Sequence, residues 1–227
     1  MKSFRLTTLI TIILFTSSSL LQSMSAPYHS AGVLPYAINS QNKVLLLVGL
    51  EPGRGNQAFD FGGKQDPEDN NNARYTAARE GTEELLFLYD QDPQEFERIL
   101  TLYRTYGKRF QLYKTNSKTY KYFTETLKVS PSSLSRGYIT YFVKVPYNAE
   151  IPKFFIDRRK SHRLPSSWIE KNQLVWLSLD EVIKALATNN NDNNFSVPST
   201  QGLIRIFPHF AQSLRTAFQN GTLAQLR

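Results

Sequence analysis

The stretch that decides the fold lies between residues 62 and 85. It opens with Gly62-Gly63-Lys64 and closes with Arg79-Glu80-Gly81-Thr82-Glu83-Glu84-Leu85. On a helix, residues three and four positions apart share a face, so Glu80, Glu83 and Glu84 present their carboxylates together. Three like charges this close repel one another, and a hard cation such as Mg²⁺ removes the repulsion by binding carboxylate oxygens. The spacing therefore predicts a metal site on one helix face.

The residue before these acids is Arg79, and the segment between the two ends of the stretch is acidic and rich in asparagine. A guanidinium can hold a carboxylate through two hydrogen bonds and so fix the loop against the helix. Glu68 and Asp69 are acids of that loop. An R-E-x-x-E-E string alone is common on solvated helix faces. The preceding strand, double glycine and acidic loop favour the metal site.

In this context the chain resembles the Nudix hydrolase family, whose motif is G-x5-E-x7-R-E-U-x-E-E-x-G-U, where U is a bulky aliphatic residue. The positions that match by identity are Gly63, Arg79, Glu80, Glu83 and Glu84. Residues 31–47 resemble the entry strands of that family, and residues 174–182 resemble its late strand and helix. The resemblance covers residues 30–187.

Three departures from the motif matter. Arg79 lies 16 positions after Gly63, two more than the motif permits, and the asparagine run at 70–72 is the natural place for the extra residues. Asp69 then falls at the distance of the upstream acid, with Glu68 as the alternative. Gly81 replaces the aliphatic residue, which weakens the helix by about 1 kcal/mol relative to Ala. Leu86 replaces the glycine that ends the helix, so the helix runs on or ends differently.

The resemblance implies an α+β fold, a Nudix-type α/β/α sandwich with a mixed sheet and a catalytic loop-helix-loop. It also implies Mg²⁺-dependent cleavage of a phosphoanhydride bond, with Mn²⁺ as the other candidate ion. The substrate would be a nucleoside diphosphate linked to another moiety, or a related polyphosphate. The alternative is a non-catalytic Nudix-like module that binds a phosphorylated ligand without cleaving it.

Roles transfer from the family residue by residue. The resemblance makes Arg79, Glu80, Glu83 and Glu84 catalytic and the three glutamates metal ligands, with Arg79 orienting Glu80 and the upstream acid. Gly63 and Lys64 would lie beside the phosphates, because a glycine without Cβ lets the backbone approach them. The general base varies within the family. It is either Glu80 or an acid on a distant loop, for which the candidates are Glu150, Asp157 and Glu170.

Two basic segments suggest where a phosphorylated small molecule binds. Lysines and arginines alternate with tyrosines and phenylalanines from residue 106 to residue 122, and Arg158-Arg159-Lys160 forms a second cluster. Cations with aromatic rings suit a nucleotide, and cations alone suit an inositol polyphosphate. Either segment could instead simply face solvent. We expect Arg158 and Arg159 at the substrate and no stable nucleic-acid complex; the oligomeric state is left open.

Composition limits the other possibilities. The chain has 227 residues, 41% hydrophobic and 20% charged, which is typical of a globular domain. The 27 basic and 19 acidic residues give a net charge of +8, which favours polyanionic partners or marks a solvated basic surface. The chain has no cysteine, which excludes disulfides, thiolate metal sites and cysteine nucleophiles.

The sequence also predicts the order of elements. Short strands are expected at residues 31–37, 44–48, 59–61, 138–145 and 175–177, by their apolar or alternating patterns. Helices are expected at 75–87, 93–103, 180–187 and 201–219. Residues 106–129 are β-rich in composition. We expect a single Nudix domain over residues 26–227, with a helix at the C-terminal end.

Residues 1–25 have the features of a signal peptide. Lys2 and Arg5 precede an apolar run from Leu6 to Phe15, which is too short for a membrane span of about 20 residues. We expect a secreted or periplasmic protein, cleaved near Ser25, with no membrane span after processing. An uncleaved anchoring helix is the alternative.

Mass spectrometry of the exported protein checks the cleavage. We expect a new N-terminus between Ser25 and Tyr28, because small residues at 23 and 25 suit the positions before the cleavage site. An exported chain that still begins with Met1 would show an anchor instead.

Overall fold

The computed structural model describes residues 28–86, 88, 90, 92–106, 117–189 and 193–227. The signal-peptide prediction and most of the first basic segment lie outside the described residues. Within them, no helix combines the length and the apolar character that a membrane span needs.

The centre of the fold is a mixed sheet around strand β1, Ser30–Ile38. β1 runs antiparallel to β2 (Val44–Glu51) and β4 (Phe61–Lys64), and parallel to β6 (Tyr138–Lys144). The outer strands are β3 (Gln57–Phe59) and β7 (Gln173–Ser178), both against β2, and β5 (Ser132–Ser135), against β6.

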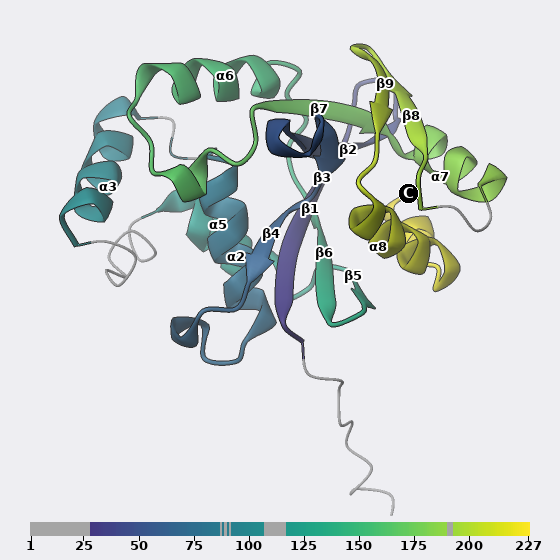
Figure 1. Ribbon diagram of the computed structural model, residues 1–227, viewed down its shortest axis with the longest axis horizontal. Coiled ribbons are helices and arrows are strands. Elements are labelled where there is room, and N and C mark those ends of the chain that lie inside the picture. Colours follow the sequence, from purple (N-terminus) through teal and green to yellow (C-terminus); the bar gives the residue numbers. More distant parts are fainter. Residues whose placement is uncertain (1–27, 87, 89, 91, 107–116, 190–192) are drawn as a thin grey trace, which may run out of the picture.

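Helices cover both faces of this sheet (Figure 1). One face carries α2 (Ala73–Glu84), α3 (Pro93–Tyr106), α5 (Lys118–Thr126) and α6 (Ile151–Ser161). The other carries α7 (Leu179–Thr188), α8 (Pro208–Gln219) and the hairpin of β8 (Ser196–Ser199) and β9 (Gly202–Arg205). Two separate buried clusters result, one on each face of the sheet. Successive residues of β1 point to opposite faces, so Val33 belongs to one cluster and Leu34 to the other. The predicted α/β/α sandwich with a mixed sheet is confirmed.

Two predicted elements are wrong. Part of the segment predicted as β-rich is helix α5, because the Ser117 side chain accepts a hydrogen bond from the Tyr120 N–H at 3.0 Å and caps the helix. The last helix starts at Pro208 rather than Gln201, since the residues before it form the β8–β9 hairpin, with Gly202 at φ 104° in its turn. Pro208 occupies the first turn, where its missing N–H costs nothing.

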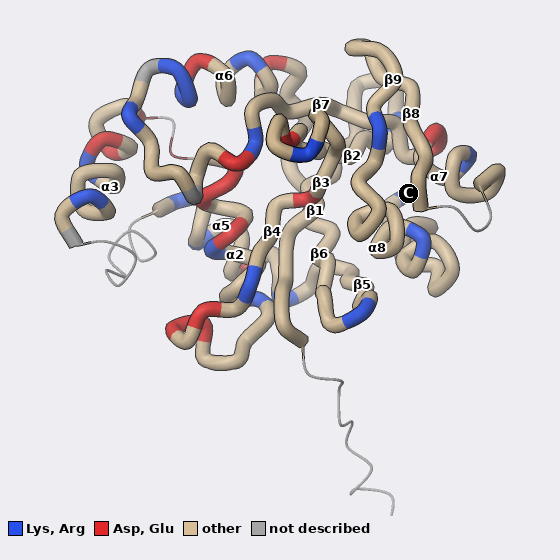
Figure 2. Tube along the Cα trace, viewed as in Figure 1, with Lys and Arg blue, Asp and Glu red and all other residues tan. Residues whose placement is uncertain are grey.

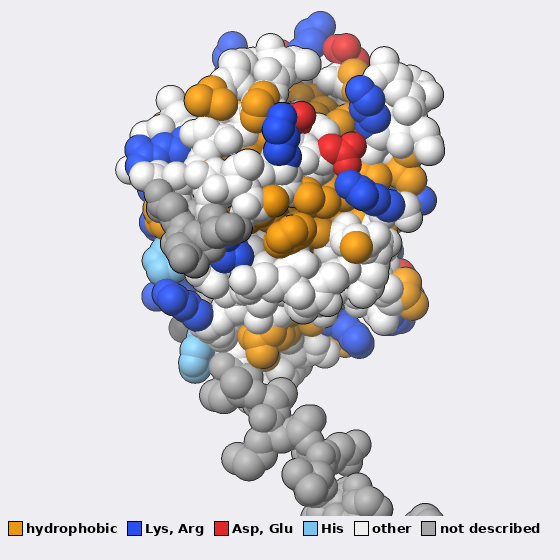
Figure 3. Space-filling model, turned by 90° about the vertical axis from the view of Figure 1, so that its right-hand side faces the viewer, with side chains coloured by type: hydrophobic (Ala, Val, Ile, Leu, Met, Phe, Trp, Pro, Cys, Tyr) orange, Lys and Arg blue, Asp and Glu red, His pale blue; other side chains and the backbone are white. Residues whose placement is uncertain are grey.

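Basic side chains are spread over the molecule. On the face shown in Figure 3, lysines and arginines lie apart from one another, some of them beside acidic side chains, and they form no continuous basic patch there.

The packing of α2 against the sheet explains why Gly81 departs from the motif. A Cβ atom added at Gly81 would lie 2.3 Å from Cγ2 of Val33 on β1. The helix therefore approaches the sheet too closely for any side chain at this position. The absence of a side chain at Gly81 costs about 1 kcal/mol of helix propensity. The close packing of the helix against β1 requires this absence.

The end of α2 explains the second departure. α2 ends at Glu84, and Leu86 adopts the left-handed conformation with φ 51°, where the motif has glycine. That conformation costs a leucine about 1–2 kcal/mol. Leu86 is fully buried in the core, which stabilises by an amount similar to or larger than this cost. The helix thus ends where the motif predicts, without its glycine.

We expect Gly81→Ala to destabilise the protein by about 1–3 kcal/mol, although alanine favours helix more than glycine, because the new methyl group overpacks against Val33. Val33→Ala removes the opposing methyl group and is the matched control. Denaturant unfolding of the two single variants and the double variant gives the coupling energy. Strictly additive free energies of unfolding would show that the close approach is not what excludes a side chain at Gly81.

Candidate active site

Arg79 joins the loop after β4 to helix α2. Its guanidinium is buried and donates to Asp69 Oδ2 at 2.9 Å, to the Lys64 carbonyl oxygen at 2.9 Å and to Glu80 Oε1 at 2.7 Å. The resemblance implied contacts of Arg79 to Glu80 and to an upstream acid, and the acid bound in the structure is Asp69 rather than Glu68. Figure 2 shows the acidic run of this loop beside the lower end of β4.

Asp69 is fully buried and saturated with donors. Besides Arg79, its carboxylate accepts from the Asp66 N–H and from the Thr76 hydroxyl, each at 3.0 Å. Burial alone would raise the pKa of Asp69, but the bonds from Arg79, Asp66 and Thr76 outweigh it and lower the pKa. Asp69 is therefore charged in the folded protein and fixes the orientation of Arg79.

The two adjacent glycines, Gly62 and Gly63, leave room for two different side chains. A Cβ at Gly63 would lie 2.5 Å from Glu80 Oε1, so the Glu80 carboxylate packs on the bare backbone there. A Cβ at Gly62 would lie 2.0 Å from the Tyr138 hydroxyl. The resemblance assigned the space over Gly63 to substrate phosphates; in the structure the Glu80 carboxylate fills it.

Glu84, like Asp69, is fully buried. Its Oε2 accepts from the Gly62 N–H at 2.8 Å, and its Oε1 lies 3.2 Å from Lys171 Nζ. Burial raises the pKa of Glu84 well above its ordinary value, and the charge of Lys171 partly offsets that effect. Burial would conversely lower the pKa of Lys171, but Glu84 and Glu51 raise it, and the net shift is upward.

Three carboxylates from distant parts of the chain meet at this point. Glu51 ends β2, Glu84 ends α2 and Glu170 precedes β7, and one oxygen of each lies within 4.8 Å of the others. Two unit charges at this distance repel by on the order of 3 kcal/mol at an effective dielectric constant of about 20. We call these three residues the acid cluster.

The acid cluster differs from the predicted metal ligands. Of Glu80, Glu83 and Glu84, only Glu84 belongs to it. Glu80 is paired with Arg79, and the charge of Glu83 acts to raise the pKa of Arg79. Glu170 is one of the three acids suggested as a distant base. Glu150 and Asp157 lie outside the cluster, at or within α6.

A divalent cation fits the chemistry of the acid cluster. Carboxylate oxygens are the ligands that Mg²⁺ and Mn²⁺ prefer, and the exposed Glu170 connects the buried Glu84 to solvent. Glu51 was missed by sequence reasoning because it lies just beyond an apolar strand, where an acid is unremarkable. Only the pairing of β2 with β7 brings it beside Glu170.

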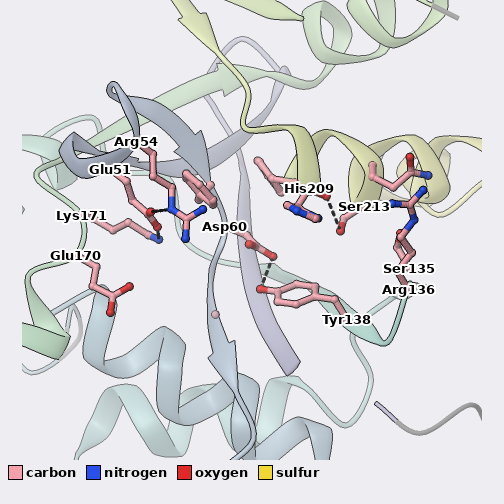
Figure 4. Close-up of a pocket in the computed structure, with 14 residues that line it drawn as sticks. Glu51, Arg54, Asp60, Ser135, Arg136, Tyr138, Glu170, Lys171, His209 and Ser213 are labelled. Atoms are coloured by element: carbon pink, nitrogen blue, oxygen red, sulfur yellow. Dashed lines mark hydrogen bonds and ion pairs between the residues drawn. The ribbon is translucent and has the colours of Figure 1, made fainter. Parts of the chain in front are cut away.

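Two members of the acid cluster, Glu51 and Glu170, line a cavity of about 290 Å³ between the sheet and the N-terminal end of α8 (Figure 4). Its lining includes the cationic or ionisable side chains of Arg54, Arg136, Lys171 and His209. None of the predicted substrate-binding residues is among the described residues that line it; these are Gly63, Lys64, Arg158 and Arg159. Whether these four residues contact a substrate therefore stays a prediction, and the basic side chains of this cavity are different ones.

Arg158 has a structural position instead. It is buried between the rings of Phe96 and Phe154, 4.3 and 4.5 Å from their centroids, and donates to the carbonyl oxygens of Leu86 and Asp90 at 2.7 Å. Burial lowers the pKa of Arg158 to about 10. The guanidinium therefore fixes the chain that leaves α2, including the left-handed Leu86, and does not face the cavity.

Asp60 is a second buried acid in the cavity wall. It accepts hydrogen bonds from the hydroxyls of Tyr138 at 3.0 Å and Thr140 at 3.3 Å. Burial raises the pKa of Asp60 from 3.8 to about 6, although Lys171 and the two hydroxyls act to lower it. Asp60 is therefore a proton-exchanging group close to neutral pH at the edge of the site.

Comparison with known proteins gives structural neighbours only. No family model matches the sequence, and no curated protein matches it. A Nudix hydrolase from M. smegmatis, RenU, is 12% identical with a TM-score of 0.40, over 88% of this chain and 89% of that chain. A C. elegans Ap4A hydrolase in a binary complex is 14% identical with a TM-score of 0.34, over 68% and 82%. At these values, chemistry must be assigned from the site itself.

We expect Asp60→Asn to change how stability depends on pH. An acid whose pKa is higher in the folded state binds its proton more tightly there, so its contribution to stability falls as pH rises from about 4 to about 6. The difference between 3.8 and about 6 corresponds to a loss of about 3 kcal/mol. The asparagine variant keeps an acceptor for Tyr138 and lacks this loss. Denaturant unfolding between pH 3.5 and 7 checks the prediction, and parallel curves for the two proteins would contradict it.

Proposed function

We propose that the chain is a Nudix-type, metal-dependent hydrolase that cleaves a phosphoanhydride bond in a phosphorylated small molecule. The observation that carries this proposal is the acid cluster, two members of which, Glu51 and Glu170, line a cavity that is also lined by basic side chains. The Arg79 clamp to Glu80 and Asp69, as the Nudix motif implies, supports the family.

The residues that would hold the cation are Glu84 and Glu170, with Glu80 beside them. The charge of Glu170 acts on the pKa values of both Glu80 and Glu84, so the three are electrostatically coupled. A bound Mg²⁺ or Mn²⁺ supplies charge that neutralises phosphate oxygens and makes a coordinated water more acidic. Arg79 keeps the Glu80 carboxylate in place.

The basic side chains of the cavity would bind the substrate phosphates. Arg54, Arg136 and His209 line it from three separate parts of the chain and can donate to different oxygens of a diphosphate. A water oxygen would attack one phosphorus, the bridging P–O bond would break, and a phosphate ester would leave. Glu170, exposed at the cavity, would take the proton of that water. The substrate class is a nucleoside diphosphate linked to another moiety, or another compact polyphosphate.

One observation favours the alternative, a module that binds the ligand without cleaving it. Both oxygens of Glu84 already have protein partners, the Gly62 N–H and Lys171. A carboxylate engaged in this way is a weaker metal ligand than a free one. The two functions separate experimentally, because the module would bind a phosphorylated ligand with no release of product.

A phosphate-release screen tests the proposal. The candidates are ADP-ribose, dinucleoside polyphosphates, nucleoside triphosphates, capped RNA and diphosphoinositols, each with and without Mg²⁺. Against the best substrate, we expect Glu170→Gln to lower kcat by at least about 100-fold, because it removes both a ligand and a base. Glu170 is exposed, so the variant should keep its fold. Glu150→Gln, an exposed acid outside the cluster, is the matched control and should retain wild-type turnover.

Two results would contradict the hydrolase. The first is ligand binding with no Mg²⁺-dependent product from any substrate of the screen, which favours the module. The second is equal turnover in the Glu170 and Glu150 variants, which would place the chemistry elsewhere on the chain.

A further inference from the structure

Lys171 occupies the inner side of the acid cluster. Its side chain is 2% exposed, and its ammonium forms ion pairs with Glu51 and, at 3.2 Å, with Glu84 Oε1. Lysine is rarely buried, because removing its charge from water is costly unless partners compensate. Here the negative charges of two carboxylates compensate the buried ammonium, and the ammonium in turn compensates those carboxylates.

The Lys171 side chain packs over a glycine of β2. A Cβ added at Gly49 would lie 2.7 Å from both Cγ and Cδ of Lys171. Gly49 lies opposite Phe59 and Leu174 in the sheet, and the Phe59 ring centroid is 5.0 Å from the ammonium. A missing side chain on β2 therefore lets the lysine reach the acids across the sheet. Figure 4 shows its ammonium beside Glu51 at the cavity.

We infer that the Lys171 ammonium is a resident cation of the acid cluster and takes the place of a divalent ion between Glu51 and Glu84. The ammonium lies between Glu51 and Glu84 and offsets their negative charge, while the Arg54 guanidinium contacts the other Glu51 oxygen at 3.1 Å. This inference deepens the proposed function and rests on it for the second cation, which would lie on the Glu170 side.

A cation tethered to the chain differs from a dissociable one. It is present without added metal, so Glu51 and Glu84 are held together in the metal-free protein. It also blocks the position between them against a divalent ion. Removing the ammonium while keeping the three acids should therefore create one additional metal site.

Counting bound Mn²⁺ tests this on the full chain without substrate. Electron paramagnetic resonance of free Mn²⁺ during titration gives the number of ions bound per chain. We expect Lys171→Met to bind one more Mn²⁺ than the wild type. Lys171→Arg, which keeps a cation, should gain none. The double variant Lys171→Met with Glu51→Gln should lose the gain, because one carboxylate of the new site is removed.

Equal Mn²⁺ counts in the wild type and the folded Lys171→Met variant would overturn the inference. If Lys171→Met folds only in the presence of millimolar Mn²⁺, as followed by circular dichroism, the inference is supported, because the ion replaces the ammonium. If it does not fold even with Mn²⁺, the inference is overturned. If the wild type binds no Mn²⁺ and the Lys171→Met variant binds one ion, this inference is supported and the metal-dependent hydrolase is contradicted.

Discussion

The buried guanidinium of Arg79 is the interaction on which the rest of the site depends. It connects three parts of the chain that would otherwise be independent: the end of β4 through the Lys64 carbonyl, the following loop through Asp69, and α2 through Glu80. A buried arginine must have its donors satisfied, or it costs several kcal/mol. The contacts of Arg79 therefore hold the loop against α2. The pairing of β4 with β1 places Gly62 where its N–H donates to Glu84, and Gly63 where the Glu80 carboxylate packs on its backbone.

The second constraint is the concentration of negative charge that this arrangement creates. Glu51, Glu84 and Glu170 approach one another closely, and Asp60 is buried nearby. Four features compensate this charge: Lys171 lies between Glu51 and Glu84, Arg54 pairs with Glu51, the Gly62 N–H donates to Glu84, and the pKa of Asp60 is raised. The site is thus kept in a state of partial charge balance.

The departures from the Nudix motif have local physical causes. Gly81 is needed because α2 lies against Val33 without room for a Cβ. Leu86 replaces a glycine in a left-handed conformation and is held by its own burial and by Arg158, which binds its carbonyl oxygen. The extra residues before Arg79 are accommodated in the asparagine-rich loop, where Asn70 and Asn71 both have positive φ. Each change leaves the acids of α2 in place.

The sequence by itself indicated the loop and helix and a layered α/β/α fold, because these follow from local spacing and periodicity. The family resemblance implied that Arg79 contacts Glu80 and an upstream acid, and only the structure decided that this acid is Asp69. The tertiary structure decided which carboxylates meet. Glu51 and Glu170 join Glu84 only through the pairing of β2 with β7, and Lys171 enters only through the gap at Gly49. It also decided that Arg158 supports the core while Arg54, Arg136 and His209 line the cavity. A basic residue has the same pattern in sequence whether its partner is a phosphate or a buried carbonyl, and only the three-dimensional contacts distinguish them.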